Sequence, residues 1–427
     1  MKKIILTFLI IGQILMAAKI DSIEINGVKV PLIYEEDRRL PLVTTQIVFT
    51  NSGTISDTKI AGLAKLSAKL LSEGTKKEGA DAFAEELESK AIHISASTGT
   101  ETFVMEVSSL KDEYKNSLKK LKKLLKDPNY TQESLSKIKT MTLGSLSRKE
   151  NDFDYIASNE LKHVLFGETV LGQPSLGTKE SVQSITLSDI KSFINEHLVL
   201  SRLIVVVGGD VSLEEVKSTI SKSLSTLKIG KSEKVIHYEV RKTPKESIIK
   251  KDTQQAYIYF GSPYHMRVND REYYKARVAT FILGTGGFGS RLMEEIRVKR
   301  GLAYSAYARV HVSKSSSYMT GYLQTKLDSM DEAKSTVTEV IAEFVKNGVT
   351  EEELEQTKKF LLGSEPLRVE TMSQRLNRTF MEYYKGFKLG HSVKELEKIK
   401  NLQLKDLNAY IKKHQEILEI SFAIVTK

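Results

Sequence analysis

A repeat within the sequence is the feature that most constrains the fold. Residues 131–145, TQESLSKIKTMTLGS, align with residues 350–364, TEEELEQTKKFLLGS, at an offset of 219, and the two segments share seven identical residues. A second pair, residues 187–194 and 404–411, follows in the same order at an offset of 217. Unrelated amphipathic helices would not keep this collinear order, so the sequence predicts one fold used twice.

Each repeat mixes strands with helices. Alternating and β-branched residues predict strands at 44–50, 92–107 and 203–207, whereas apolar residues at helical spacing predict helices at 60–71 and 112–126. The second half follows the same plan, with predicted strands and helices at 256–260, 270–283, 302–310 and 330–346. Hairpin strands and grouped helices favour an α+β class over a doubly wound parallel sheet. We expect two similar α/β-sandwich-like halves, each an antiparallel-rich sheet with helices.

A polar, charged stretch at residues 230–247, GKSEKVIHYEVRKTPKES, is the predicted linker between the halves. It divides the chain into a first repeat at 19–229 and a second at 248–427. Each repeat is long enough to bury a core of its own.

The N-terminal segment, residues 1–18, has the pattern of a secretory signal peptide. Lys2 and Lys3 precede an apolar run at 4–16, and Ala17 and Ala18 supply small residues for cleavage. No later segment approaches the apolar length of a membrane span. We therefore expect an exported, periplasmic protein with no membrane attachment after cleavage, and an uncleaved anchor is the alternative.

Composition removes several kinds of chemistry. The chain has no cysteine, which excludes thiolate nucleophiles, disulfides and iron–sulfur ligation. The formal charge of +10 is spread through the chain, and we interpret it as favouring solubility rather than nucleic-acid binding. The eight histidines are too far apart in sequence to write H-E-x-x-H or H-x-x-E-H, so the usual helical zinc site is not available.

Residues 284–289 match G-x-G-x-x-G, but a helical pattern precedes them where a dinucleotide site needs a strand. The residues that follow are more informative. The segment 287–305, GFGSRLMEEIRVKRGLAYS, strongly resembles the second-half signature of the zinc peptidase family of insulysin, pitrilysin and mitochondrial processing peptidase. The resemblance implies that Arg297 and Tyr304 reach the zinc site of a catalytic half. A tyrosine hydroxyl can donate to a scissile carbonyl oxygen, and arginine can orient it or hold the substrate backbone. The structural alternative is a capping arginine and a half-buried strand tyrosine.

The resemblance covers essentially the whole chain after the signal segment, yet the metal motif is missing. The family's H-x-x-E-H falls in the segment 62–75, GLAKLSAKLLSEGT, where Lys65 and Lys69 occupy the histidine positions and Ala68 the glutamate position. The third ligand should fall near Leu143, and no acid occurs from 138 to 147. A lysine ammonium has no lone pair to give a metal. We expect no metal and no other cofactor on this chain.

This loss of the metal groups, with the arginine–tyrosine pair kept, resembles the non-catalytic subunit of heterodimeric members of the family. The sequence therefore predicts a protein that is not an enzyme on its own. It would pair with a homologous zinc-bearing subunit and supply Arg297 and Tyr304 for the cleavage of extended peptides. The alternative is a periplasmic peptide-binding or chaperone-like pseudoenzyme with no proteolytic role.

Overall fold

The computed structural model describes residues 18–427, so the predicted signal peptide lies outside the described residues except for Ala18, which is buried. Among the helices of residues 18–427, none combines the length and the apolar character that a membrane crossing requires.

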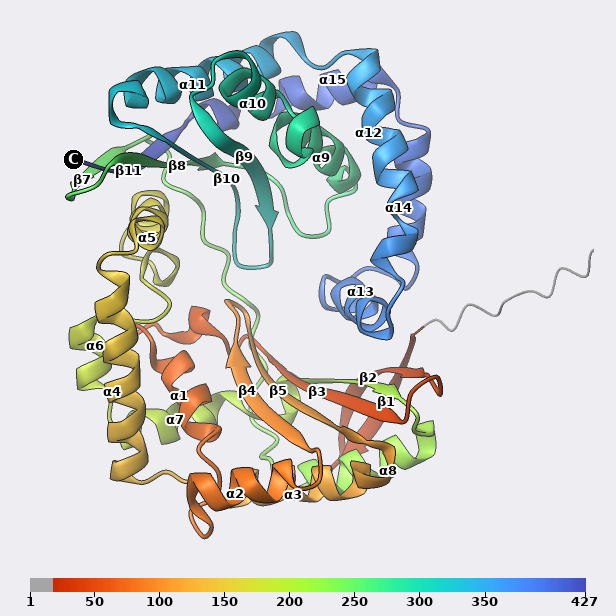
Figure 1. Ribbon diagram of the computed structural model, residues 1–427. Coiled ribbons are helices and arrows are strands. Elements are labelled where there is room, and N and C mark those ends of the chain that lie inside the picture. Colours follow the sequence, from red (N-terminus) through yellow and green to blue (C-terminus); the bar gives the residue numbers. More distant parts are fainter. Residues whose placement is uncertain (1–17) are drawn as a thin grey trace, which may run out of the picture.

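Two sheets of related topology form the cores of the two halves, one below the other in Figure 1. The strands of the first sheet are β1 (Lys19–Ile25), β2 (Val28–Glu36), β3 (Leu42–Thr50), β4 (His93–Thr98), β5 (Thr102–Leu110) and β6 (Leu203–Gly209). Those of the second are β7 (Glu246–Lys250), β8 (Gln255–Pro263), β9 (Ala303–Val312), β10 (Ser317–Lys326) and β11 (Ser421–Thr426).

The strand orders are β1-β2-β6-β3-β5-β4 and β7-β11-β8-β10-β9, so the second matches the first once β1 is set aside. The equivalent pairs β2–β6 and β7–β11 are parallel, and all other neighbours are antiparallel. The predicted α+β fold of two similar halves is confirmed.

Helices surround each sheet. The first half contains α1 (Leu63–Leu71), α2 (Gly79–Glu88), α3 (Tyr114–Lys126), α4 (Gln132–Lys149), α5 (Phe153–Phe166), α6 (Lys179–Ser184), α7 (Leu187–His197) and α8 (Leu213–Leu224). The second contains α9 (Tyr273–Thr280), α10 (Arg291–Met293), α11 (Met330–Asn347), α12 (Glu351–Gly363), α13 (Met372–Tyr384), α14 (His391–Lys400) and α15 (Leu404–Lys413).

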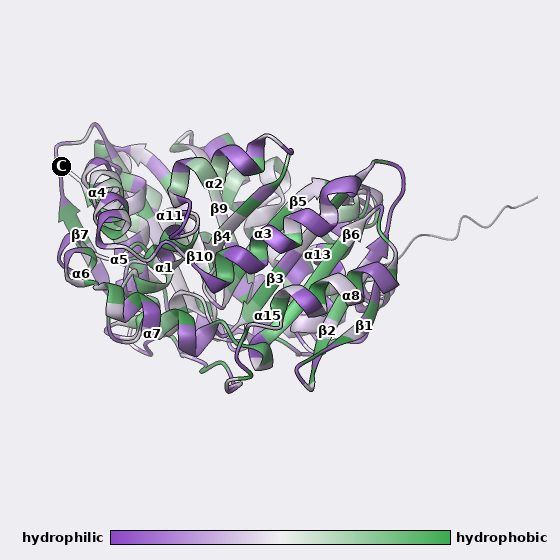
Figure 2. Ribbon diagram, turned by 90° about the horizontal axis from the view of Figure 1, so that it is seen from below, coloured by the Kyte–Doolittle hydropathy of each residue, from purple (hydrophilic) through white to green (hydrophobic). Residues whose placement is uncertain are grey.

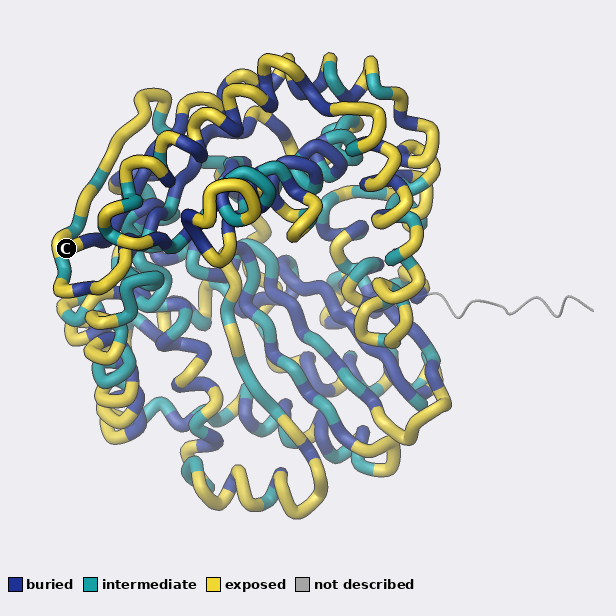
Figure 3. Tube along the Cα trace, turned by 45° about the horizontal axis from the view of Figure 1, so that its top comes forward, coloured by how far each residue is buried: buried dark blue, intermediate teal, exposed yellow. Residues whose placement is uncertain are grey.

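The repeated segments begin equivalent helices. Thr131 caps α4 and Thr350 caps α12, each side chain accepting a hydrogen bond from the backbone N–H three residues later. The outer helices are amphipathic, as α3 illustrates: Leu118, Leu121 and Leu124 are buried among the lysines of the same helix. Figure 2 shows this alternation of hydrophilic and hydrophobic residues along α3 and α8, and exposed residues follow the outer helices in Figure 3.

The halves exchange one helix each. Helix α5 of the first half packs on β8 and β11 of the second sheet, and its equivalent α13 packs on β2 and β6 of the first (Figure 1). This exchange explains why β6 is apolar along its whole length. Val205 and Val207 belong to the core beneath the first-half helices, whereas Ile204 and Val206 pack with Leu376 of α13. Both faces of the strand are therefore covered.

Polar contacts also join the halves. Arg375 of α13 forms an ion pair with Glu35 of β2, whose side chain is 1% exposed. Glu101, in the β4–β5 turn, accepts hydrogen bonds from the backbone N–H of Ser315 and the hydroxyl of Tyr384. Residues 225–245 contain no helix or strand, and β7 begins at Glu246, two residues inside the predicted linker.

Candidate functional site

Helix α1 contains Lys65, Ala68 and Lys69, the residues at which the resemblance places the family's metal motif. It begins after Gly62, which has a φ of +89°, and the carboxylate of Asp57 accepts hydrogen bonds from the backbone N–H groups of Gly62 and Ala64. Ala68 is 2% exposed and packs in the core of the first half. Ala68, at the position where the resemblance places the family's glutamate, is therefore a packing residue in this chain.

The two lysines of α1 point away from that core. The Lys69 ammonium donates to the hydroxyl of Thr142 on α4 over 2.9 Å. Burial, followed by the charge of Lys65, lowers the pKa of Lys69. The groups that meet at this point are thus a cation and a neutral hydroxyl.

These residues do not fit a zinc ion. Zinc in proteins is bound by thiolate, neutral imidazole or carboxylate groups, and Lys65, Lys69 and Thr142 supply none of these. Across residues 18–427, no group of three or more His, Asp or Glu residues is arranged to hold a metal ion. Sequence reasoning placed the third ligand near Leu143, and the structure puts the adjacent Thr142 in contact with α1.

The second half holds the arginine–tyrosine pair. Helix α10 continues into a π-helical turn, Glu294–Lys299, in which Ile296 is buried and Arg297 faces outward. Gly301, with a φ of +63°, ends this segment, and β9 starts at Ala303. The chain reversal leaves Arg297 and Tyr304 on neighbouring segments.

The pair is preorganised by stacking. The Arg297 guanidinium lies 4.3 Å from the ring centre of Tyr304 and 4.4 Å from that of Phe288. Such cation–π contacts stabilise a fixed orientation of both groups. Tyr304 is nevertheless 82% exposed, so its hydroxyl is accessible from outside the chain.

The glycine loop before this pair has a packing role. A Cβ atom at Gly284 would lie 2.2 Å from the backbone nitrogen of Ala308. Glycine is therefore required for this π-helical segment, Phe281–Thr285, to approach β9.

The structure keeps the two predicted sets of residues on different halves. Lys65, Ala68 and Lys69 lie on α1 in the lower half of Figure 1, and Arg297 and Tyr304 lie next to α10 and on β9 in the upper half. Lys69 contacts Thr142 of its own half, whereas Arg297 contacts Phe288 and Tyr304 of the other half.

Comparison with known proteins shows the family of this chain. A family model described as Insulinase (Peptidase family M16) matches residues 34–179, and one described as Peptidase M16 inactive domain matches residues 184–361. Over all 427 residues the chain is 43% identical to the Non-peptidase homolog YmxG of Helicobacter pylori, covering 99% of that protein. The chain belongs to the insulinase (M16) family of peptidases.

Other relatives are more distant. The chain is 25% identical over 336 residues to an uncharacterized zinc protease, YmxG, of Bacillus subtilis, covering 78% of this chain and 80% of that one. Two crystal structures share the fold. A peptidase M16 inactive domain from Pseudomonas fluorescens has a TM-score of 0.87 at 23% identity, covering 96% of this chain and 98% of that one. A protease from Helicobacter pylori has a TM-score of 0.82 at 16% identity, covering 96% and 100%.

Within the M16 family, two findings support a non-catalytic member. The most similar of these relatives is described as a non-peptidase homolog, and the family model that matches residues 184–361 is described as an inactive domain. Independently, Lys65, Ala68 and Lys69 offer no metal ligand.

Proposed function

We propose that this chain is the non-catalytic subunit of a two-chain zinc peptidase. It would bind a homologous, zinc-bearing M16 chain and contribute Arg297 and Tyr304 to the site at which that partner cleaves extended peptides. One observation carries the proposal: the Arg297–Tyr304 pair is preorganised and exposed in a chain whose own α1 cannot hold the metal.

The chemistry assigned to the pair is what the family resemblance implies, and the stacked geometry supports it. The Tyr304 hydroxyl would donate a hydrogen bond to the carbonyl oxygen of the scissile peptide as that oxygen gains negative charge. Arg297, stacked on the Tyr304 ring, would hold the phenol in place and leave guanidinium N–H groups for the substrate backbone. The stacking would restrict the orientations of both side chains before the substrate binds.

The N-terminal signal motif supports a periplasmic location in this proposal. The substrate would bind as an extended strand, because strand addition to a sheet edge satisfies a peptide backbone without requiring a particular sequence. In the first sheet β4 is such an edge, and in the second β9, which carries Tyr304, is another.

The test is reconstitution with a homologous chain that carries an intact H-x-x-E-H. Size-exclusion chromatography should show a stable complex, and a permanent interface of this kind usually buries more than roughly 2,000 Å². The Tyr304→Phe variant should assemble normally but lower the turnover of an unstructured peptide by about 10²–10³-fold.

Tyr307→Phe is the matched control, since Tyr307 lies on the same strand but is half-buried beside Tyr322. Its turnover should stay near that of the wild type. Unchanged turnover in the Tyr304→Phe complex would contradict the role of the hydroxyl. A chain that stays monomeric beside the zinc-bearing homologue and binds peptide alone would favour the peptide-binding pseudoenzyme.

A further inference from the structure

A pocket of about 350 Å³ lies between the two halves. Its walls include the β4–β5 turn and α5 of the first half, and the β9–β10 turn and α13 of the second. The volume falls within the range of sites that hold small ligands or single peptide side chains. The Arg297–Tyr304 pair does not line it.

Both carboxylates that line this pocket are already engaged. Asp57 accepts the N–H groups of Gly62 and Ala64 over 3.1 and 2.8 Å. Glu101 accepts the N–H of Ser315 and the hydroxyl of Tyr384, each over 2.6 Å.

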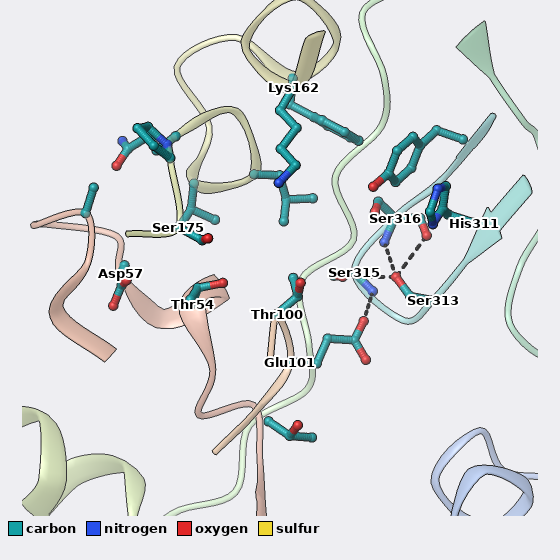
Figure 4. A pocket seen from close by; sticks show the side chains of 18 of the residues that line it. Thr54, Asp57, Thr100, Glu101, Lys162, Ser175, His311, Ser313, Ser315 and Ser316 are labelled. Carbon is teal, nitrogen blue, oxygen red and sulfur yellow. Dashed lines mark hydrogen bonds between the residues drawn. The ribbon is translucent and has the colours of Figure 1, made fainter. Parts of the chain in front are cut away.

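Lys162 is a cation that lines this pocket, and neither of these two carboxylates serves as its counterion. Its side chain extends from α5 into the pocket, toward the wall where Thr54, Thr100 and Ser175 lie (Figure 4). Burial lowers the pKa of Lys162, and the charged neighbour that lowers it further is Lys65, a second cation. A buried ammonium beside another cation is stabilised by any anion that enters.

The remaining wall indicates what kind of anion fits. Phe166 and Leu171 from the first half and Phe380 from the second line the same pocket and supply apolar surface. A carboxylate attached to an apolar group matches both features, since the ammonium pairs with the charge and the apolar wall covers the rest.

We propose that this pocket binds a peptide carboxylate, with the Lys162 ammonium as its ion-pair partner and the threonine and serine hydroxyls as additional donors. A C-terminal residue with an apolar side chain has the chemistry that this wall accepts, and an aspartate or glutamate side chain is the other source of the same group. The proposal rests on the proposed peptide-handling role. The carboxylate-binding proposal is tested on this chain alone. It can therefore fail while the two-chain peptidase proposal stands, and the two-chain proposal can fail while this one stands.

The experiment measures binding of fluorescently labelled nonapeptides to the full chain by anisotropy. One peptide ends in leucine with a free carboxylate, a second is its C-terminal amide, and a third is the amide with an internal glutamate. A charge-assisted hydrogen bond predicts that the free acid binds roughly ten- to a hundred-fold more tightly than the plain amide. Lys162→Met should remove this preference, and Lys162→Arg should keep most of it.

Lys394→Met on α14 is the matched control, because Lys394 is exposed and does not line the pocket. It should bind all three peptides as the wild type does. If the glutamate peptide equals the free acid, the carboxylate can come from a side chain; if it equals the amide, the chain end is recognised. Equal binding of acid and plain amide, no binding of either at millimolar concentration, or an unchanged preference in Lys162→Met would overturn the proposal.

Discussion

The two halves of this protein share a sheet topology apart from the additional strand β1, but they differ in the polar residues that their equivalent regions carry. In the first half, α1 has a buried apolar face and a cap from Asp57, while Lys65, Ala68 and Lys69 offer no metal ligand. In the second half, the segment after α10 keeps both its packing and its Arg297–Tyr304 pair. The difference teaches that α1 completes the first-half core without any metal-binding side chain. A helix needs only its apolar face for packing, so its metal ligands can be lost while the fold persists.

The largest expected effect is on zinc content, and it comes from introducing metal-binding residues into the first half. The triple variant Lys65→His, Ala68→Glu and Lys69→His should still lack stoichiometric zinc, because the facing residue is the hydroxyl of Thr142. Adding Thr142→Glu should raise the zinc content to about one ion per chain, since a carboxylate then faces α1. Elemental analysis after dialysis measures the zinc.

Met141→Glu in the triple background is the control, because Met141 is 61% exposed on the same helix. It should bring no zinc. Circular dichroism checks that the buried substitution at Ala68 leaves the helices intact. One zinc ion per chain in the triple variant would contradict the prediction. It would mean that the three substitutions on α1 are sufficient for zinc binding without a new carboxylate at Thr142.

The next effect concerns the contact that joins the halves. Arg375→Ala leaves the buried Glu35 carboxylate without its cation and should destabilise the protein by about 3–5 kcal/mol. Burial already raises the pKa of Glu35, so the variant should also favour the protonated carboxyl. Denaturant unfolding measures the loss.

The exposed Arg271 provides the comparison, and Arg271→Ala should change stability by less than about 0.5 kcal/mol. The double variant Arg375→Met with Glu35→Leu should recover much of the loss, because neither charge then remains buried. A loss as small as that of Arg271→Ala would show that the ion pair does not hold the halves together.

A smaller effect on stability distinguishes the packing beneath the two exchanged helices, α5 and α13. A Cβ at Gly261 would lie 2.8 Å from the carbonyl oxygen of Met319 and 2.9 Å from Leu165 of α5. A Cβ at Gly208 would meet only side-chain atoms of α13, from Leu376 and Met372. Overpacking typically costs about 1–3 kcal/mol, and backbone yields less than flexible side chains. Gly261→Ala should therefore lower the thermal midpoint more than Gly208→Ala, and the opposite order would contradict this account of the packing.

A further effect is a pH dependence of stability, opposite in sign at two residues that line the pocket. Burial raises the pKa of Asp57 to about 7, so its contribution to stability falls as the pH rises from about 4 to about 7. Burial, with the charges of Arg309 and Lys162, lowers the pKa of His311 to about 4, so its contribution rises between about pH 4 and 6.5.

Removing each group should reveal these opposite slopes. Relative to the wild type, His311→Gln should become less stable as the pH rises from 4 to 6.5, whereas Asp57→Asn should become more stable from 4 to 7. Unfolding midpoints at half-unit pH steps test the signs. Parallel curves for both variants would mean that the two groups titrate normally in the folded chain.

Local and repeated patterns could be interpreted from the sequence alone. The duplication, the α+β class, the caps at Thr131 and Thr350 and the segment carrying Arg297 and Tyr304 all depend on residues close together in the chain, where periodicity and capping chemistry act. The absence of metal ligands at Lys65 and Lys69 is likewise a matter of residue type, because no arrangement of the chain gives an ammonium a lone pair.

Tertiary structure decided three features: the exchange of α5 and α13, the contact of Lys69 with Thr142, and the separation of the Lys162 ammonium from the pocket carboxylates. Each depends on residues far apart in sequence: α13 covers β6, and Lys69 meets a hydroxyl on another helix. An apolar helix face specifies that it must be buried but not which sheet buries it, because hydrophobic attraction has no direction. In the same way, the sequence places a lysine at position 162 but does not determine which groups surround its ammonium. Only the placement of Asp57 and Glu101 with other donors leaves its charge open to a ligand.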